Sequence, residues 1–475
     1  MTKNLFLVLL LTVQITFAQI ISKDSNFASN GVAEIPSNSI TNSYQMVQNS
    51  NGEIYFTYNM DVAIGITHGF VTKLTPNGTP DPAFGNNGTV KLPSEPSMTQ
   101  IKLQADGKLL IFSLLANAQI LRLLPNGQID PTFGTNGISQ EIDADHDDYF
   151  NSYEFILQNG KILVHGIRRG QDPHHTIYRL NADGNLDNSF GNNGSVTTKG
   201  NLTGRTFVFI DNQSNIISFS DNISVIEKFD PDGHPIANFG NNGTAQISIN
   251  GTSVGDVGDV FLDSNNKIVF STFQNNNMFR LNQDGSLDNT FNYDLQTSLG
   301  LPSGPRILNI TEKDGYYYIG GAAGDSMYNN NYFISKLNPN GSLNSTFGYH
   351  IETNYDETGL ISKFFSVTEM IINNNNIIVK GNNNIVKYLL NSGTLSTADI
   401  TKAAHTISFE NPVKQNLVYQ SKEKVNKIEI YSLDGKAIKT IKNSGTQVSE
   451  LPKGIYITKV TFESGSSISK KLIKN

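Results

Sequence analysis

An acidic cluster holds the residues best suited to binding a metal ion. Asp143, Asp145, Asp147 and Glu154 stand at positions 1, 3, 5 and 12 of a calcium-loop spacing, in which carboxylate oxygens surround the ion. Position 6 needs a sharp turn that glycine makes most easily, but Asp148 stands there. Two interpretations stay open, a solvated acidic loop between strands or a calcium site, and we assign no metal ligand from this spacing.

The eight histidines are scattered along the chain and form no recognisable catalytic motif. His174 and His175 lie in a polar stretch that we expect to be a loop. A metal shared by these two is not expected, because adjacent side chains of an extended segment point in opposite directions. The chain has no G-x-S-x-G, H-E-x-x-H or P-loop motif. Zero cysteines exclude disulfides, thiolate metal sites and cysteine nucleophiles. We therefore predict no catalytic, cofactor-binding or metal residues.

Two tyrosines offer a binding chemistry instead. Tyr328 and Tyr332 flank three asparagines, and flat aromatic faces beside amides suit sugars or peptides. An ordinary exposed loop explains the same residues, so neither tyrosine is assigned to a site.

One motif recurs through most of the chain. Lys73–Gly88 reads KLTPNGTPDPAFGNNG, and Arg122–Gly137 reads RLLPNGQIDPTFGTNG. Four more copies follow, at Arg179–Gly194, Lys228–Gly243, Arg280–Leu295 and Lys336–Tyr349. Upstream of each copy, two apolar runs flank a polar turn, which is typical of a β-hairpin. About four strands per unit of roughly 52 residues is the size of a β-propeller blade, and the sequence contains seven such units.

The two ends of the repeat region complete each other. The last unit stops after Lys387–Gly393, and its missing second half stands near the N-terminus as Asp24–Val32. The chain therefore begins with the tail of a blade and ends with its head. We predict that residues 20–33 pair with residues 376–395 and close a ring without exposed sheet edges.

The recurring residues are expected to serve structure. An Asp before a turn, as at Asp81, accepts backbone N–H groups two or three residues ahead. Ile236 and Asn344 replace this Asp in two units, which argues against a repeated metal site. The Phe that recurs in all seven units is predicted to pack between blades. The motif resembles the delta-60 repeat, which is found in tandem in large secreted bacterial proteins with propeller-like folds. The resemblance implies no assigned activity.

The N-terminus has the pattern of a signal peptide. Lys3 precedes the apolar run Leu5–Leu11, and the small residues Thr16 and Ala18 stand before Gln19. We therefore predict a signal peptide over residues 1–18 and a secreted or cell-surface location. No other stretch is long and apolar enough to span a membrane.

The C-terminal region differs in charge from the rest. Residues 401–475 hold 13 lysines and six acidic residues, whereas the whole chain has a net charge of −7. The change of sign indicates a separate module, and the small polar residues before it indicate a linker. We predict a propeller over residues 19–395, a linker over 396–404 and a C-terminal domain over 405–475.

Four motifs of this module occur in a recognisable order: Asn411-Pro412, Ile428–Lys436, Leu451–Tyr456 and Lys470–Lys474. They resemble the C-terminal sorting domain (type A) of Bacteroidetes type IX secretion. The resemblance implies an immunoglobulin-like β-sandwich that an outer-membrane translocon reads and that is often removed on export. Asp325-Ser326-Met327 also has the form of an O-glycosylation site of these bacteria, which raises the question whether Ser326 is modified.

The predicted fold is all-β: a seven-bladed β-propeller closed by the N- and C-terminal halves of one blade, followed by a small immunoglobulin-like β-sandwich. The leading functional hypothesis is a non-catalytic binding or adhesion scaffold for an extracellular glycan, peptide or protein. The alternatives are an enzyme that degrades extracellular polysaccharides or peptides, and a purely structural matrix component. Nucleic acid is not an expected partner, because the acidic propeller region would repel phosphate.

Overall fold

The structure is a computed structural model in which the chain divides into two compact units, Met1–Gly393 and Thr394–Asn475. The predicted signal peptide (1–18) and linker (396–404) lie outside the described residues. The described residues are 21–36, 42–63, 66–93, 99–113, 119–142, 150–168, 174–200, 205–221, 224–249, 251–273, 277–291, 293–294, 306–323, 331–352, 367–381, 383–390, 407–409, 412–421, 424–432, 437–442, 444–463 and 467–474.

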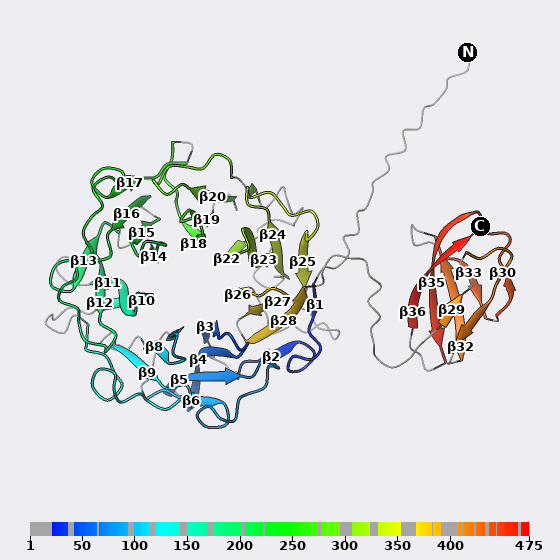
Figure 1. Ribbon diagram of the computed structural model, residues 1–475, viewed down its shortest axis with the longest axis horizontal. Helices are drawn as coiled ribbons and strands as arrows, with labels where there is room; N and C mark the ends of the chain where they lie inside the picture. The colour runs from blue at the N-terminus through cyan, green and yellow to red at the C-terminus, as the bar shows by residue number, and fades with distance from the viewer. Residues whose placement is uncertain are drawn as a thin grey trace, which may run out of the picture. The chain divides into compact units, whose positions relative to one another are not determined.

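The described residues form β-strands and no helix, as the repeats predict. In the first unit the described strands make seven antiparallel sheets, which follow one another around a ring (Figure 1). The first strand of each sheet lies nearest the centre of the ring (Figure 1). The first strands are β3 (Asn42–Gln48), β7 (Thr99–Leu103), β10 (Phe150–Gln158), β14 (Thr206–Ile210), β18 (Val257–Leu262), β22 (Arg306–Lys313) and β26 (Glu369–Ile372).

The second and third strands carry most of the buried apolar side chains, because they have a neighbouring strand on either side. The second strands are β4 (Ile54–Ala63), β8 (Leu109–Ser113), β11 (Lys161–Arg168), β15 (Ile216–Ser220), β19 (Ile268–Thr272), β23 (Tyr316–Ala323) and β27 (Asn376–Lys380). The third strands are β5 (Ile66–Leu74), β9 (Gln119–Leu123), β12 (His174–Leu180), β16 (Val225–Phe229), β20 (Asn277–Leu281), β24 (Asn331–Leu337) and β28 (Asn384–Leu390).

The fourth strands are short and follow the recurring motif. They are β6 (Thr89–Lys91), β13 (Ser195–Thr198), β17 (Thr244–Gln246), β21 (Tyr293–Asp294) and β25 (Tyr349–Glu352). In the sheet of β7 to β9, a single bridge between Leu121 and Ile138 takes this place. In the last sheet the fourth position belongs to the two N-terminal strands β1 (Ile21–Lys23) and β2 (Val32–Glu34).

The N-terminal strands close the ring as the split motif predicts. β1 pairs with β28 in the register Ile21↔Leu390, and β2 pairs with the same strand in the register Val32↔Val386. A polar cluster ties β1 to the neighbouring sheet as well. Lys23 Nζ lies 2.6 Å from Glu352 Oε2, and the Tyr388 hydroxyl donates to Glu352 Oε1 at 2.8 Å. The ring is therefore held at its seam by backbone pairing and by a partly buried ion pair.

The recurring Asp acts as the turn residue that the sequence predicts. In five units its Oδ1 accepts the backbone N–H two residues ahead, for example from Thr132 to Asp130 at 3.0 Å and from Ser189 to Asp187 at 3.2 Å. Its other oxygen binds the basic residue that opens the motif, as in Arg179 Nε–Asp187 Oδ2 at 2.7 Å. The sequence analysis did not foresee this ion pair.

The recurring Phe packs between neighbouring sheets, as predicted. All seven are buried, with at most 8% of the residue exposed. Each motif presents its first glycine to the Phe of the preceding motif. A Cβ on Gly184, for instance, would lie 2.8 Å from the Phe133 ring, and Gly184 also has a φ of +89°. The close contact and the positive φ both require glycine there.

The second unit is a small all-β domain with one core, formed by residues such as Ile428, Ile430, Val460 and Leu472. Its strands are β29 (Ile407–Phe409), β30 (Asn416–Leu417), β31 (Tyr419–Ser421), β32 (Val425–Tyr431), β33 (Ala437–Ile441), β34 (Thr446–Gln447), β35 (Gly454–Phe462) and β36 (Ser467–Lys474). They form a sheet in the order β33-β32-β35-β36 and two two-stranded sheets, β29-β31 and β30-β34. The last two sorting motifs thus become neighbouring strands, since Gly454 pairs with Lys474.

Candidate functional site

The two ends of the ring carry different parts of the repeat. Every first strand begins at one end and every second strand ends there, as in the pairs Thr206↔Ser220 and Val257↔Thr272. We call this end the strand-start face. The opposite end carries the tight turns between first and second strands and the repeated Asp–Phe–Gly turns. Variable side chains on a repeated scaffold are the usual place for ligand contacts.

A chain of hydrogen bonds links the first strands around the centre of the ring. At five of the interfaces, a polar side chain on one first strand accepts a backbone N–H from the next first strand. The five bonds are Met46 N–H to Glu369 (2.6 Å), Ile101 N–H to Gln45 (2.9 Å), Phe155 N–H to Gln100 (3.1 Å), Val208 N–H to Glu154 (2.9 Å) and Ile310 N–H to Asp259 (2.6 Å). These acceptors satisfy edge N–H groups that no strand pairs with.

Three of these acceptors are carboxyl groups with unusual acidity. Burial raises the pKa of Glu369 to about 7, although the nearby Lys380 lowers it. Burial also raises the pKa of Asp259 to about 7, against the hydrogen bond from Ile310 and the charge of Arg205. Burial also raises the pKa of Glu154. Two carboxyl groups at the centre of the ring, Asp259 and Glu369, are therefore partly protonated near neutral pH.

An exposed cluster of two arginines and one phenylalanine lies on the strand-start face. Arg205 directly precedes β14, Phe273 directly follows β19, and Arg306 begins β22, so the three come from consecutive sheets. The guanidinium carbons of Arg205 and Arg306 each lie 5.9 Å from the centre of the Phe273 ring. Phe273 is one of the exposed large apolar residues, with 37% of its surface accessible. We call these three residues the Arg–Phe–Arg cluster.

The backbone around the cluster is held in place by hydrogen bonds and a close strand contact. Phe273 N–H donates to the carbonyl of Asp256 at 3.1 Å. A Cβ on Gly258 would lie 2.4 Å from the Ile307 carbonyl oxygen and 3.3 Å from Phe273 Cε1. Glycine at this position therefore lets β18 approach β22 and leaves room for the phenyl ring.

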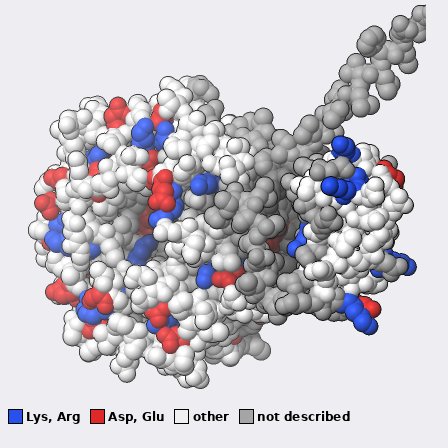
Figure 2. All heavy atoms as spheres, turned by 45° about the vertical axis from the view of Figure 1, so that its right-hand side comes forward, with Lys and Arg blue, Asp and Glu red and all other residues white. Residues whose placement is uncertain are grey.

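The charges of the two arginines are balanced differently. The backbone N–H of Arg205 donates to Asp221 Oδ1 at 2.8 Å, and the side-chain Nε of Arg205 lies 3.7 Å from Asp221 Oδ2. Among the described residues, no carboxylate forms an ion pair with Arg306. On the face seen in Figure 2, basic and acidic side chains of the propeller unit are interspersed.

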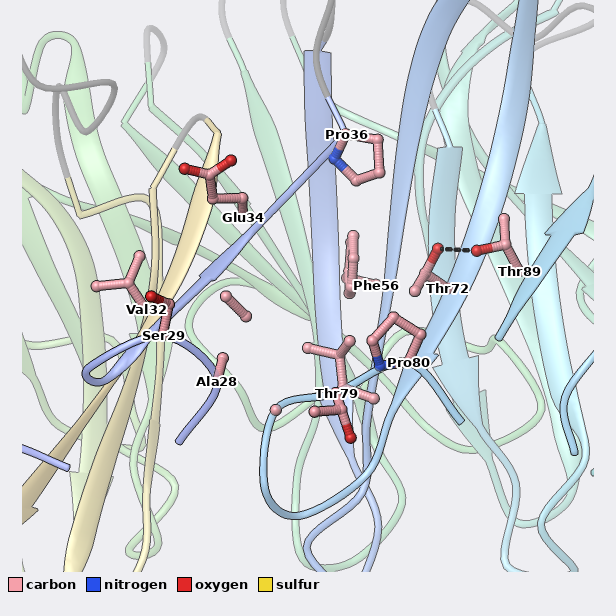
Figure 3. Close-up of a pocket in the computed structure, with 13 residues that line it drawn as sticks. Ala28, Ser29, Val32, Glu34, Pro36, Phe56, Thr72, Thr79, Pro80 and Thr89 are labelled. Carbon is pink, nitrogen blue, oxygen red and sulfur yellow. Dashed lines mark hydrogen bonds between the residues drawn. The ribbon is translucent and has the colours of Figure 1, made fainter. Parts of the chain in front are cut away.

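A pocket of about 320 Å³ lies at the seam, between β2 and the following sheet. Figure 3 shows Val32, Ser29 and Ala28 on one side, and Thr72, Thr89 and Pro80 on the other, with Phe56 between them. The wall is mostly apolar. Thr72 and Thr89 share a hydrogen bond of 2.8 Å across their hydroxyls (Figure 3).

A small residue, Ala33, lines the pocket at one position of the repeat. Ala33 pairs with Ile385 just as Val90 pairs with Val71 in the next sheet. At two other interfaces the corresponding valines, Val90 and Val196, reach the first glycine of the next motif, whose Cβ would lie 2.7 and 2.6 Å from a valine methyl. Ala33 lacks these two methyl groups and lines the seam pocket.

The structure describes only part of the predicted acidic cluster. Asp143, Asp145, Asp147 and Asp148 lie outside the described residues. Glu154 lies in β10, where its carboxylate accepts the N–H of Val208 from the next sheet. This side chain therefore takes part in the contact between first strands. No group of three or more His, Asp or Glu residues in the described ranges is arranged to hold a metal ion.

Two interpretations of aromatic and histidine residues were wrong. His175 lies in strand β12 and is buried, with Nδ1 3.3 Å from His165 Nε2 on β11, so it is no loop residue. Burial lowers the pKa of His165 to about 3. Tyr332 is buried in β24, and its hydroxyl lies 2.5 Å from that of Tyr388. Tyr332 is therefore no exposed binding platform; Tyr328 and Ser326 lie outside the described residues.

The sequence analysis missed the Arg–Phe–Arg cluster and the hydrogen-bonded first strands. The sequence does hold a signal for the hydrogen-bonded first strands: the polar acceptor directly precedes a buried apolar residue in Gln45-Met46, Gln100-Ile101 and Asp259-Val260. The cluster has no such signal, because its residues come from three different repeats.

Comparison with known families identifies the C-terminal unit. Residues 409–475 match the secretion system C-terminal sorting domain. This chain carries a type IX secretion sorting domain. The protein is therefore exported through that system to the cell surface or the extracellular space, as the resemblance implied.

The repeats match a second family. Residues 104–133, 157–190, 264–291 and 312–347 match the domain of unknown function DUF5122, a β-propeller. The match agrees with the ring of sheets and confirms the propeller fold. No curated protein matches this chain in sequence.

Solved structures with a similar course of the chain include virginiamycin B lyase from Staphylococcus aureus (14% identity, TM-score 0.43, covering 74% of this chain and 95% of that one). Others are a streptogramin B lyase (12%, 0.45, 76% and 97%) and the extracellular domain of the hybrid two-component system BT3049 from B. thetaiotaomicron (12%, 0.42, 92% and 56%). At this level of similarity none of them bears on what this chain binds. No described segment forms a helix able to cross a membrane.

Proposed function

We propose that this protein is an exported β-propeller that binds an extracellular ligand on its strand-start face without transforming it. The observation that carries the proposal is that the recurring polar residues of the motif contact one another and are not available to a ligand. The recurring Asp and the basic residue of its motif bind each other, as Arg122 and Asp130 do at 2.9 Å, and the recurring Phe is buried. Exposed polar groups that belong to single repeats remain for recognition.

The second unit contains the signal for export. We propose that residues 405–475 are read by the outer-membrane translocon of type IX secretion. Removing Leu451–Asn475 deletes β35 and β36, which form half of the four-stranded sheet. We expect this truncated protein to accumulate in the periplasm of a type IX host, as fractionation would show. Normal surface display of the truncated protein would contradict this role.

An enzyme is the second candidate, and one observation favours it. Asp259 and Glu369 have pKa values of about 7, which suits a general acid or base. Each of them, however, already accepts a backbone N–H from a neighbouring strand.

One experiment separates the two candidates. The full exported chain is applied to a glycan and peptide array, and the same preparation is tested for turnover of common extracellular polysaccharides and peptides. Binding without turnover supports the proposal. Turnover that D259N or E369Q abolishes would establish the enzyme instead.

A further inference from the structure

We propose that the Arg–Phe–Arg cluster binds an acidic polysaccharide, with carboxylate or sulfate groups on the two guanidinium groups and a sugar ring against Phe273. The inference rests on the proposed binding function and names the class of ligand. It starts from the contrast between these arginines and the others that the structure describes.

The arginines of the recurring motif are not available to a ligand. Arg122, Arg179 and Arg280 are buried, and each has Nε within 2.9 Å of the recurring Asp of its own motif. Their charges are thus neutralised inside the repeat. Arg306 is exposed and has no carboxylate partner among the described residues, and the Arg205 side chain is 49% exposed.

The Phe273 ring lies beside both charges without neutralising them, and Arg205 also lies 5.3 Å from the Phe207 ring centre. A guanidinium group that packs against an aromatic ring keeps its in-plane N–H donors free for hydrogen bonds. Those donors match the two oxygens of a carboxylate or sulfate, and a bidentate contact of this kind is stronger than a contact between neutral groups. Both guanidinium groups lie 5.9 Å from one ring centre, so they are separated by no more than twice that distance.

This arrangement fits a polysaccharide better than the other anionic polymers. Successive sugars of an acidic polysaccharide carry charges at a comparable separation and present apolar C–H faces between them, which suits the exposed Phe273 ring. A nucleic acid has a far denser charge than an acidic polysaccharide, so the acidic remainder of the propeller region would repel it more strongly. An acidic peptide carries the same charged groups without the sugar ring, so the experiment includes it as a separate probe.

The test uses isothermal titration of the full exported chain with four probes: oligogalacturonate, a chondroitin sulfate oligosaccharide, a neutral maltooligosaccharide of the same length and an oligoglutamate. We expect at least one acidic oligosaccharide to bind, and the neutral one and oligoglutamate to bind at least tenfold more weakly. Raising the salt concentration should weaken the binding, because the contacts are ionic.

Variants locate the site. R306A should weaken binding at least tenfold, and R306K should recover part of it, because lysine keeps the charge but loses the bidentate geometry. F273A should weaken binding to the oligosaccharide. The matched control is K313A, which removes the same charge from the other end of β22, where Lys313 is paired with Asp314 at 3.7 Å. K313A should leave binding unchanged, and melting curves should show that all four variants fold.

Four results would overturn the inference or the function on which it rests. Equal loss of binding in R306A and K313A would mean a general charge effect, and equal binding of oligoglutamate would mean an acidic-peptide site. Binding of another ligand that is insensitive to R306A would reject the cluster and leave the proposed binding function standing. Turnover of a probe would reject the proposed function itself.

Discussion

At the scale of single residues, the recurring Asp of the repeat accepts several hydrogen bonds at once. Asp187 accepts bonds from Lys161, Arg179 and Ser189 while only 5% of it is exposed. Burial alone would raise its pKa, but these bonds outweigh burial and hold the pKa of Asp187 well below its usual range. In Asp130 the same balance lowers the pKa to about 2. The carboxylate of the recurring Asp is therefore buried and engaged in hydrogen bonds and an ion pair within the motif.

Replacing Asp187 with Asn should destabilise the propeller by about 3 kcal/mol, because Arg179 would remain buried and lose its buried charge partner, so that only the exposed Asp232 is left beside it. Urea unfolding measures the effect. The control is D232N: Asp232 contacts the same Arg179 at 3.1 Å, but its side chain is 65% exposed. We expect D232N to change stability by less than about 0.5 kcal/mol. Equal effects of the two substitutions would show that burial of the pair is unimportant.

The carboxyl groups between the first strands have raised pKa values, whereas the pKa values of Asp187 and Asp130 are lowered. The raised pKa values predict that the stability of the propeller falls as the pH rises. The pKa of Glu369 is about 7 in the folded protein, above the usual value of about 4.3 for an unfolded chain. Between these two values the folded state holds a proton that the unfolded state has lost. The free energy of unfolding should therefore fall as the pH rises from about 4 to 7.

E369Q should remove this dependence, because glutamine keeps the acceptor for Met46 N–H and cannot ionise. Gln45 and Gln100 already occupy the equivalent places at the next two interfaces. We expect E369Q to raise the melting temperature at pH 8 and to change it little at pH 5. A larger gain at pH 5 than at pH 8 would show that the assigned sign is wrong.

At the scale of elements, the sheets are joined by side chains that reach from one repeat to the next. The packing is tight where Val90 and Val196 meet the following glycine, and it is loose at the seam, where Ala33 stands. The difference between these interfaces is two methyl groups at one position of the fourth strand.

A33V should therefore fill part of the seam pocket and stabilise the propeller by about 1 kcal/mol. V196A makes the reverse change at another interface and should cost about 1.5 kcal/mol. Chemical unfolding of the two variants would measure both free-energy changes. Destabilisation by A33V would mean that the pocket lacks room for the methyl groups or is kept open by a ligand.

At the scale of the whole molecule, the ring depends on a segment that lies more than 300 residues from its partner in the chain. β1 and β2 pair with β28, and Lys23 reaches Glu352 of the adjacent sheet. The segment also supplies Phe27, whose ring fills the space above Gly78 in the next sheet.

Deleting Gln19–Ile35 should expose the edge of β28 and lower the melting temperature of the entire propeller. Differential scanning calorimetry would measure this. Deleting residues 396–475 is the control, because the second unit is compact on its own. We expect this control to leave the propeller transition in place. An unchanged melting temperature after the N-terminal deletion would contradict the role of the seam.

The sequence by itself determined the architecture, because the information is local and repeated. The sequence of each unit predicts its own hairpins and turns, and the half-motif Asp24–Val32 indicates where the ring closes. The roles of the recurring Asp and Phe followed from turn chemistry and side-chain volume. The sorting domain followed from motifs that are short and contiguous.

Only the tertiary structure decided which residues of different repeats meet. The bond from Val208 N–H to Glu154 and the cluster of Arg205, Phe273 and Arg306 join positions at least 33 residues apart, so no local sequence pattern indicates them. The errors have the same cause. Tyr332 and His175 lie in polar stretches, yet the start of a third strand places each between neighbouring strands and buries it. Composition predicts whether a segment is polar, but burial depends on which sheet packs against it.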